Sequence, residues 1–286
     1  LKERSKIIHC DDKITMTDKP SDVIRSKKKS SMHLSIENVL SGKSQAILSC
    51  GNTGALMAIS LLKLKTVANI KRPAIASIWP NLKGESIVLD LGANIKNETS
   101  NLIDNAILGS ALATVLFNMN DPTIGILNIG IEDLKGNEVV QEASEILNDM
   151  QKNGQLNYYG FIEGADISIG KTNVVVTDGF TGNIALKTAE GTSKFIIKNL
   201  KKSLTENIVT RLSLLLSYFS LKKFKNKLDP RKYNGAIFLG LNGPVVKSHG
   251  GVDSYGFYHS INLCYKIVKG NLMKQVKNNL RHSKIV

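Results

Sequence analysis

Short runs of apolar, often β-branched residues alternate along the chain with longer segments whose apolar residues recur at helical spacing. The short runs predict strands at residues 46–49, 74–78, 86–90, 123–129, 173–178 and 236–239. The longer segments predict helices at residues 32–40, 53–64, 99–116, 138–150 and 181–200. Several predicted strands lack polar alternation, so both of their faces are expected to be covered, as in a largely parallel sheet. The pattern predicts an α/β protein with helices on both faces of the sheet.

The sequence shows no boundary between two domains. The 6 prolines are scattered, and no linker rich in Gly and Ser divides the 286 residues. We therefore expect residues 1–286 to form a single α/β domain, with a helical excursion at 192–232. A hydrophobic fraction of 42% is enough for a substantial core, which excludes a disordered or fibrous protein.

The cysteines and histidines do not cluster. Cys10, Cys50 and Cys264 are far apart and odd in number, and the 5 histidines are equally scattered. This pattern predicts no disulfide framework and no metal site, and it favours a reducing compartment. Because the sequence also shows no secretion signal and no apolar run of membrane-spanning length, we expect a soluble cytoplasmic protein.

The charge is basic and unevenly distributed. The chain has 38 Lys and Arg against 24 Asp and Glu, a net charge of +14, but only 6 of the basic residues are Arg. Arg makes the forked contacts of specific base recognition, so nucleic acid is not the expected partner. A general bias toward Lys explains part of the excess. Residues 198–232 alone carry 10 basic and 2 acidic residues, which makes the charge mainly a local feature.

Two predicted strands lead into similar glycine-containing loops. The loops read Ser-Cys-Gly-Asn-Thr-Gly-Ala-Leu at 49–56 and Thr-Asp-Gly-Phe-Thr-Gly-Asn-Ile at 177–184. Each enters a predicted helix, whose N-terminal N–H groups and dipole favour an anion. The repetition predicts two helix N-termini that face one phosphate site. The alternative is that these Asn, Thr and Gly residues are ordinary capping and turn residues.

Carboxylates end two buried strands. Asp90 ends the strand predicted at 86–90 and opens the loop Asp-Leu-Gly-Ala-Asn, which ends at Asn94, and Asp178 is the last residue of the strand predicted at 173–178. A carboxylate in this position is costly unless other groups compensate its charge. Structural capping and a functional role are both open for each residue.

Two further segments are candidate functional sites: a Gly-rich loop and a segment that only approximates a nucleotide-binding motif. The loop at 241–251 follows a predicted strand and supplies Lys247, Ser248 and His249, and a histidine in such a loop is a good functional candidate. Residues 165–172 approximate a phosphate-binding loop, but a strand follows them where that mechanism needs a helix. We therefore expect no nucleotide there, and no Gly-x-Gly-x-x-Gly supports a dinucleotide cofactor.

Five ordered blocks resemble the phosphate acyltransferases of bacterial phospholipid synthesis. They are Ser-x-Gly-Asn-Thr-Gly-Ala-Leu-Met (49–57), Leu-Asp-Leu-Gly-Ala-Asn (89–94), Asn-Ile-Gly-Ile-Glu-x-x-Lys-Gly (128–136), Thr-Asp-Gly-Phe-Thr-Gly-Asn-Ile-x-Leu-Lys (177–187) and Gly-Leu-x-Gly-x-Val-x-Lys-Ser-His-Gly (240–250). The resemblance implies a Rossmann-like fold akin to phosphotransacetylase and isocitrate dehydrogenase. It also implies a homodimer that uses no metal and no organic cofactor.

The activity implied by this resemblance is the synthesis of acyl phosphate from acyl-carrier-protein thioesters and inorganic phosphate. A membrane-bound acyltransferase then passes the acyl group to glycerol 3-phosphate, so the resemblance implies loose attachment to the inner face of the cell membrane. The family begins with a β-α unit bearing Met-Gly-Gly-Asp, and nothing similar precedes Pro20. We therefore expect either a chain truncated at its N-terminus, by on the order of 30 residues or more, or a degenerate enzyme.

The candidate residues suit this chemistry. Phosphate is itself the nucleophile and a thiolate leaves readily, so the protein must hold an anion against a carbonyl and stabilise an oxyanion. Lys187 lies on the same helix face as Asn183, where it can neutralise phosphate or oxyanion, and His249 can donate a proton or a hydrogen bond to the leaving sulfur. The residues expected to bind phosphate or substrate, or to orient those that do, are Asn52, Thr53, Gly54, Asp90, Asn94, Asp178 and Thr181.

An apolar stretch at 208–221 precedes a cluster of lysines. The stretch is too short to span a bilayer but suits an interfacial helix on anionic lipid. Its expected membrane-facing residues are Leu214, Leu215, Phe219, Lys222 and Lys223. It can also pack against the same segment of a second copy, and the two roles are compatible.

Two other function classes stay open. A phosphotransacetylase-like enzyme that uses acyl-coenzyme A would share the fold and the phosphate site. A non-enzymatic basic protein that binds membrane or nucleic acid would need none of the strand-end loops, and its binding would weaken steeply with salt.

Overall fold

The computed structural model describes residues 2–67, 70–96, 98–132 and 134–283. Within these residues, eight strands form one sheet in the order β1-β8-β7-β2-β3-β6-β4-β5. They are β1 (Ile47–Ser49), β2 (Ala74–Asn81), β3 (Gly84–Leu89), β4 (Ile124–Leu127), β5 (Tyr158–Ile162), β6 (Val174–Val176), β7 (Ala236–Leu239) and β8 (Val245–Lys247).

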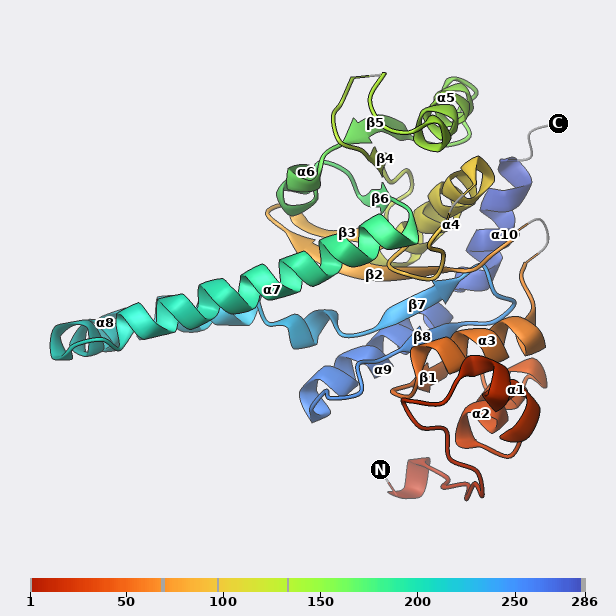
Figure 1. Ribbon diagram of the computed structural model, residues 1–286, viewed down its shortest axis with the longest axis horizontal. Coiled ribbons are helices and arrows are strands. Elements are labelled where there is room, and N and C mark those ends of the chain that lie inside the picture. Colours follow the sequence, from red (N-terminus) through yellow and green to blue (C-terminus); the bar gives the residue numbers. More distant parts are fainter. Residues whose placement is uncertain (1, 68–69, 97, 133, 284–286) are drawn as a thin grey trace.

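Helices flank the sheet on both faces (Figure 1). They are α1 (Pro20–Ser26), α2 (Ser31–Leu40), α3 (Thr53–Leu64), α4 (Thr99–Phe117), α5 (Glu138–Lys152), α6 (Gly164–Ile169), α7 (Gly179–Leu204), α8 (Ile208–Lys227), α9 (Ser254–Lys269) and α10 (Leu272–His282). Two short 3-10 turns lie at Lys2–Arg4 and Pro230–Tyr233.

The core explains why the strands lack polar alternation. Ile87 and Leu89 of β3 pack into the large core cluster under α4, α5, α9 and α10, whereas Val88 packs on the other face with Ile167 of α6. On that second face α1, α2 and α3 cover the β1/β8/β7 half of the sheet, where Phe238 is buried. Apolar residues are therefore required at consecutive strand positions.

The strands run in two directions, so their carboxyl ends lie at two opposite ends of the sheet. β3, β6, β4 and β5 are parallel, β2 is antiparallel to both β3 and β7, and β7 is antiparallel to β8, which is parallel to β1. β1 and β8 therefore run opposite to β3 and β6. We call the end of the sheet where β3 and β6 finish the β3/β6 edge, and the end where β1 and β8 finish the β1/β8 edge.

The sequence pattern predicts most of these elements. All six predicted strands and all five predicted helices are present, and the helix at Thr53–Leu64 has the predicted limits. β5 and β8 were not predicted: β5 contains Gly160 at φ 116°, and β8 is only 3 residues long after Pro244. The antiparallel placement of β2 and β7 was not predicted either, so the sheet is only predominantly parallel.

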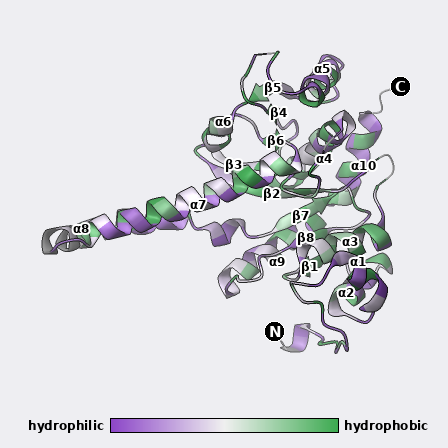
Figure 2. Cartoon of the chain, viewed as in Figure 1, coloured by the Kyte–Doolittle hydropathy of each residue, from purple (hydrophilic) through white to green (hydrophobic). Residues whose placement is uncertain are grey.

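A helical arm projects from the body of the protein. α7 leaves the sheet and α8 follows it at its far end, where the pair extends away from all other elements (Figure 1). Hydrophobic and hydrophilic residues alternate along the projecting part of α7 (Figure 2). Exposed apolar side chains on the arm include Phe195, Ile196, Leu216 and Phe219. This agrees with the predicted helical excursion at 192–232.

Among the described helices, α4 alone is long and apolar enough to cross a membrane. Most of its apolar window, 61%, is buried inside the protein. Leu102, Leu108 and Leu112 of α4 are part of the main core cluster. Its apolar composition is therefore explained by its central position under the sheet.

Candidate functional site

At the β3/β6 edge, a buried carboxylate organises the loop after β3. Asp90 is 0% exposed. Its Oδ1 accepts the N–H groups of Ile75, Gly92 and Ala93 at 3.1, 3.0 and 2.9 Å. Its Oδ2 accepts the backbone N–H and the side-chain amide of Asn94 at 2.8 and 2.9 Å. Burial raises the pKa of Asp90, opposed by these hydrogen bonds.

This arrangement shows that Asp90 orders its own loop, and its predicted role of orienting catalytic groups stays a prediction. It argues against the prediction that Asn94 binds phosphate or substrate through its amide N–H groups. The Asn94 amide is buried and also donates to the Pro73 carbonyl at 2.8 Å, so both of its N–H groups are used inside the protein. The loop is shaped by its own hydrogen bonds.

The first turn of α7 packs directly against that loop, and this requires glycine. The Gly179 N–H donates to the Asn94 carbonyl at 2.9 Å. A Cβ atom at Gly182 would lie 2.0 Å from the Asp90 carbonyl oxygen, and one at Gly179 would lie 2.4 Å from that of Asn94. No larger residue fits at either position without moving the backbone.

Every N–H group of this first turn has an acceptor within the protein. Asp178 caps the helix and accepts the N–H groups of Phe180 and Thr181 at 3.0 and 2.9 Å. The Gly182 N–H donates to the Asp178 carbonyl at 2.9 Å. The α7 N-terminus therefore has no N–H group left for phosphate, which corrects the prediction that it is one half of a phosphate cradle.

Asn183 and Lys187 are also engaged. The Asn183 amide donates to the Leu91 carbonyl at 3.0 Å and so ties α7 to the Asp90 loop. The Lys187 ammonium pairs with the Glu190 carboxylate at 2.9 Å on the exposed helix surface. A surface ion pair of this kind is weak and can exchange for a bound anion. The catalytic roles predicted for these two residues stay predictions.

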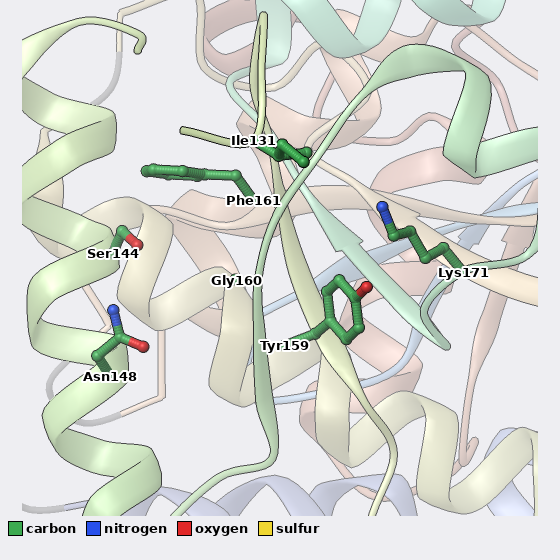
Figure 3. Close-up of a pocket in the computed structure, with 7 residues that line it drawn as sticks. All are labelled: Ile131, Ser144, Asn148, Tyr159, Gly160, Phe161 and Lys171. Atoms are coloured by element: carbon green, nitrogen blue, oxygen red, sulfur yellow. The ribbon is translucent and has the colours of Figure 1, made fainter. Parts of the chain in front are cut away.

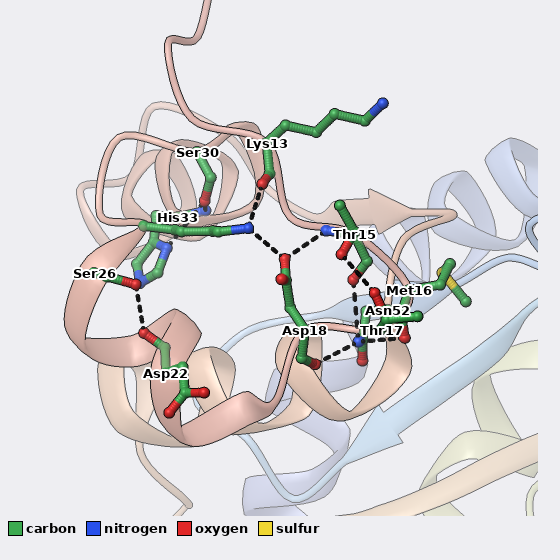
Figure 4. A network of polar contacts seen from close by, with 11 residues as sticks. Lys13, Thr15, Met16, Thr17, Asp18, Asp22, Ser26, Ser30, His33 and Asn52 are labelled. Atoms are coloured by element: carbon green, nitrogen blue, oxygen red, sulfur yellow. Dashed lines mark hydrogen bonds and ion pairs between the residues drawn. The ribbon is translucent and has the colours of Figure 1, made fainter.

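At the β1/β8 edge, Asn52 both caps α3 and holds the N-terminal segment. Its Oδ1 accepts the Ala55 N–H at 3.0 Å. Its amide donates to the carbonyls of Thr15, Met16 and Asp18 at 3.3, 3.1 and 3.0 Å (Figure 4). With both ends of the amide occupied, the structure corrects the prediction that Asn52 donates to substrate.

Thr53 and Gly54 are the first two residues of α3, and their N–H groups point out of the start of the helix. Thr53 and Gly54 are exposed. Among the described residues, no acceptor is hydrogen-bonded to either N–H group. Unpaired N–H groups at a helix N-terminus form a binding position for an anion.

The loop after β8 lies beside this helix start. Ser49 and Lys247 are register partners in parallel strands, and the Ser248 N–H donates to the Ser49 carbonyl at 2.9 Å. Burial lowers the pKa of Lys247, whose ammonium is near the Cys50 thiol and donates to the Ser248 carbonyl. Among the described residues, no carboxylate forms an ion pair with Lys247. A half-buried ammonium of this kind favours an anionic ligand.

His249 is held in one tautomer by its own loop. The Gly251 N–H donates to His249 Nδ1 at 3.1 Å, so in this geometry Nδ1 accepts and Nε2 carries the proton. Asn234 accepts the His249 N–H at 3.1 Å and donates to the hydroxyls of Ser248 and Ser260, both at 2.7 Å. The sequence did not single out Asn234, which precedes β7 and is separated from His249 by 15 residues.

The two predicted helix N-termini do not share an edge of the sheet. Ser49, the last residue of β1, is in register with Lys247 of β8, Ala236 of β7 and Ser77 in the middle of β2. After Ser49 the chain leaves β1 at the β1/β8 edge. The chain leaves β3 and β6 in the opposite direction. The prediction of a single site that both helices face is therefore wrong for one chain. Thr53, Gly54 and His249 lie at one edge, and Asp178, Thr181 and Asn183 at the other.

The segment that approximates a phosphate loop has another structure. α6 precedes Gly170 and Lys171, and β6 follows them, which confirms that no helix N-terminus meets this loop. Lys171 pairs with Asp166 at 3.0 Å and lies 5.4 Å from the Tyr159 ring centre. Nearby, β5 borders a cavity of about 300 Å³ that is lined by Ile131, Ser144, Asn148, Tyr159, Gly160, Phe161 and Lys171 (Figure 3). No predicted site residue lines it.

Solved structures share this fold. A branched-chain phosphotransacylase from Enterococcus faecalis matches with a TM-score of 0.55 at 17% identity, over 83% of this chain and 78% of its own. The EutD phosphotransacetylase from Staphylococcus aureus matches with a TM-score of 0.53 at 17% identity, over 89% of this chain and 74% of its own. The fold is therefore that of the phosphotransacetylase class of α/β proteins, as the sequence blocks predicted.

Closer relatives define the family. The model of the fatty acid synthesis protein family matches residues 1–275. A phosphate acyltransferase of Pelagibacter ubique is 50% identical over 275 residues, which are 96% of this chain and 82% of the relative. One of Azorhizobium caulinodans is 48% identical over 281 residues, 98% of this chain and 79% of the relative. The chain belongs to this family, and it is an enzyme of the phosphate acyltransferase kind.

Proposed function

We propose that the enzyme transfers the acyl group of an acyl-carrier-protein thioester to inorganic phosphate, with phosphate bound at the β1/β8 edge. A phosphate oxygen attacks the thioester carbonyl, the new C–O bond forms, the C–S bond breaks, and the departing thiolate takes up a proton. The products are acyl phosphate and the free carrier thiol. The names of the relatives support phosphate and an acyl donor as substrates.

The observation that carries the placement is the set of unused donors at this edge. The N–H groups of Thr53 and Gly54 lie at the positive end of the α3 dipole, and the Lys247 ammonium, which has no carboxylate partner among the described residues, adds a full charge. Together they can hold a phosphate dianion against an acyl carbonyl. Donors that are already in position also stabilise the oxyanion that develops during attack.

His249 is the candidate hydrogen-bond donor to the leaving sulfur. Its fixed tautomer presents Nε2–H, and the side chain is exposed, so a thioester sulfur can approach it. A positioned hydrogen-bond donor to a developing anion contributes about 100- to 1,000-fold. Because a thiolate is a good leaving group, we expect the low end of this range.

The test is phosphate-dependent formation of acyl phosphate from acyl-carrier protein. His249→Gln should lower kcat about 100-fold and leave the KM for phosphate unchanged. Failure to consume acyl-carrier protein when phosphate is added would contradict the function. A preference for acyl-coenzyme A over acyl-carrier protein would replace the proposed donor with coenzyme A, the main alternative.

The arm supports a second element of the proposal, attachment to the inner face of the cell membrane as a homodimer. Phe219 is 81% exposed, Lys222 and Lys223 are exposed, and the Lys222 ammonium lies 5.7 Å from the Tyr218 ring centre. Leu214 is half-buried, and the side chain of Leu215 lies outside the described residues. Apolar and basic residues at the end of a projecting helix suit anionic lipid, and the flank of the arm suits a second copy.

Membrane attachment would place acyl phosphate next to a membrane-bound glycerol-3-phosphate acyltransferase. The test is co-sedimentation with vesicles that contain anionic lipid. Reversing the charge of Lys222 and Lys223 should weaken binding at low salt by at least about 30-fold, because each of the two basic residues near the surface contributes about 1 kcal/mol. Unchanged binding would contradict the attachment, and equilibrium sedimentation tests the dimer.

A further inference from the structure

The outer face of α9 carries an apolar stripe that the core does not use. Phe257, Ile261 and Tyr265 follow one another at four-residue spacing, and Tyr258 lies beside them. They are 39%, 49%, 59% and 59% exposed, respectively. The opposite face of the helix supplies the buried residues Ser260, Leu263 and Ile267. We call Phe257, Tyr258, Ile261, Tyr265, Lys266 and Lys269 the α9 face.

The charges on α9 and on the chain after it have one sign. After Asp253 the sequence contains 6 basic residues and no acidic residue. Lys266 and Lys269 lie on α9 itself, and both are exposed. The Lys269 ammonium lies 5.6 Å from the Tyr265 ring centre, so charge and apolar surface are combined in one patch. Aromatic residues flanked by cations are typical of a surface that binds an acidic protein.

The α9 face has a fixed position relative to the proposed site. Asn234 donates to the Gly256 carbonyl at 3.0 Å and accepts the N–H of His249 at 3.1 Å, so one side chain joins the helix start to the site loop. Asp253 caps the helix by accepting the Gly256 N–H at 3.0 Å. From Phe257 to Tyr265 the stripe is about 12 Å long, at 1.5 Å per residue. A partner bound there has its nearest edge beside the His249 loop.

We propose that the α9 face is the docking surface for the acidic carrier that presents the acyl thioester. This inference rests on the proposed function, because that function requires a protein-borne thioester at the His249 loop. Carboxylates of the carrier pair with Lys266 and Lys269, and apolar residues of the carrier cover Ile261 and Tyr265. The prosthetic arm of the carrier then runs along α9 toward its N-terminus and the phosphate position.

The experiment compares two acyl donors that differ only in the carrier. The variant Lys266→Glu with Lys269→Glu is assayed with an acyl-carrier-protein thioester and with the same acyl group on pantetheine. The KM for the carrier thioester should rise at least tenfold and its salt dependence should weaken, while kcat/KM for the pantetheine thioester stays within twofold. Calorimetric binding of the unacylated carrier should weaken by the same factor, and this readout needs no turnover.

Two further variants complete the design. Ile261→Ser with Tyr265→Ser removes the apolar stripe from an exposed face and should also raise the KM for the carrier. Lys43→Glu with Lys152→Glu makes the same charge change at two exposed positions away from α9 and should leave the KM within twofold.

Three outcomes would overturn the proposal. The first is an unchanged KM for the carrier and unchanged carrier binding in the α9 variants. The second is an equal loss with both donors, which would show damage to the site. The third is a change in sedimentation or in vesicle binding without a change in carrier binding, which would assign the face to a second copy or to lipid. Absence of turnover with both donors in the unaltered enzyme would instead contradict the proposed function, while carrier binding would still test the docking surface.

Discussion

The α3 and α7 helix starts share the pattern Gly-x-Thr-Gly and have different uses. At α7 the N–H groups of residues 179–182 all donate to Asn94 or Asp178, so the helix start is closed by the protein. At α3, Asn52 accepts from Ala55 and Leu56, and within the part of the chain that the structure describes the N–H groups of Thr53 and Gly54 have no acceptor. The difference follows from the position of the N-cap: Thr53 and Gly54 are the first two residues of α3 after Asn52, whereas Thr181 and Gly182 are the third and fourth residues of α7 after Asp178. The first two N–H groups of α7 belong to Gly179 and Phe180, which donate to Asn94 and Asp178.

The largest effect on catalysis should come from removing a hydrogen-bond donor at the start of α3. Thr53→Pro removes one N–H group and one hydroxyl at the first helical position, where proline fits the helix. We expect kcat/KM for phosphate to fall about 100- to 1,000-fold, as when an oxyanion donor is lost. Thermal unfolding should change little. Thr181→Val, at the matching position of the motif but the third position of α7, should stay within threefold, and a comparable loss there would contradict the comparison.

The next largest effect should be on stability at the β3/β6 edge. Asp90→Asn replaces an oxygen that accepts hydrogen bonds with an amide that must donate, in a fully buried site that presents only N–H groups. We expect a loss of about 3 kcal/mol in the free energy of unfolding, measured by urea denaturation. Asp178→Asn should cost less than about 1 kcal/mol, since Asn is also a good N-cap. Equal costs would contradict the structural role assigned to Asp90.

Substituting one lysine at each edge tests which edge binds phosphate. Lys247→Met removes a half-buried ammonium that lacks a carboxylate partner among the described residues, and the KM for phosphate should rise about tenfold or more. Lys187→Met removes only a surface ion pair with Glu190, and the KM should change less than twofold. Steady-state kinetics with varied phosphate measures both. The reverse order would move the phosphate site to α7.

The smallest effect concerns pH and stability near the β3/β6 edge. Burial in α4 raises the pKa of Asp104 from 3.8 to about 6. The folded state therefore binds the proton more tightly than the unfolded state, and this contribution to stability is lost as the pH rises toward and through 6. Asp104→Asn should gain about 1 kcal/mol at pH 8, allowing for partial exposure, and nothing below pH 4. A gain of equal size at both pH values would contradict the assignment.

The sequence predicts the core of the fold but not the separation of the two edges. Runs such as 86–90 and 173–178 are strands because consecutive residues are buried on two faces, and this is visible in one dimension. The direction of β2 and β7 depends on which strands they pair with, and no local pattern encodes that choice. The shared motif at α3 and α7 therefore predicted a shared site that one chain does not contain.

For the site residues too, roles set by nearby residues could be predicted, whereas roles set by contacts distant in sequence could not. Asp90 was expected to orient other groups, and its five hydrogen bonds order the loop that it opens. Asn52 and Asn94 were expected to bind substrate, but their amides hold backbone carbonyls from residues 15–18 and 73, which are distant in sequence. Asn234 was missed for the same reason, since nothing in the sequence connects it to His249.

The most direct test of the account is a titration of the protein with inorganic phosphate, followed through its backbone amide NMR signals. We predict saturable shifts of the Thr53 and Gly54 amide signals and of the side-chain ammonium signal of Lys247. We predict no specific shift of the Phe180 or Thr181 amide signals. Saturable shifts at residues 179–183 with none at 53–54 would contradict the placement of phosphate at the start of α3.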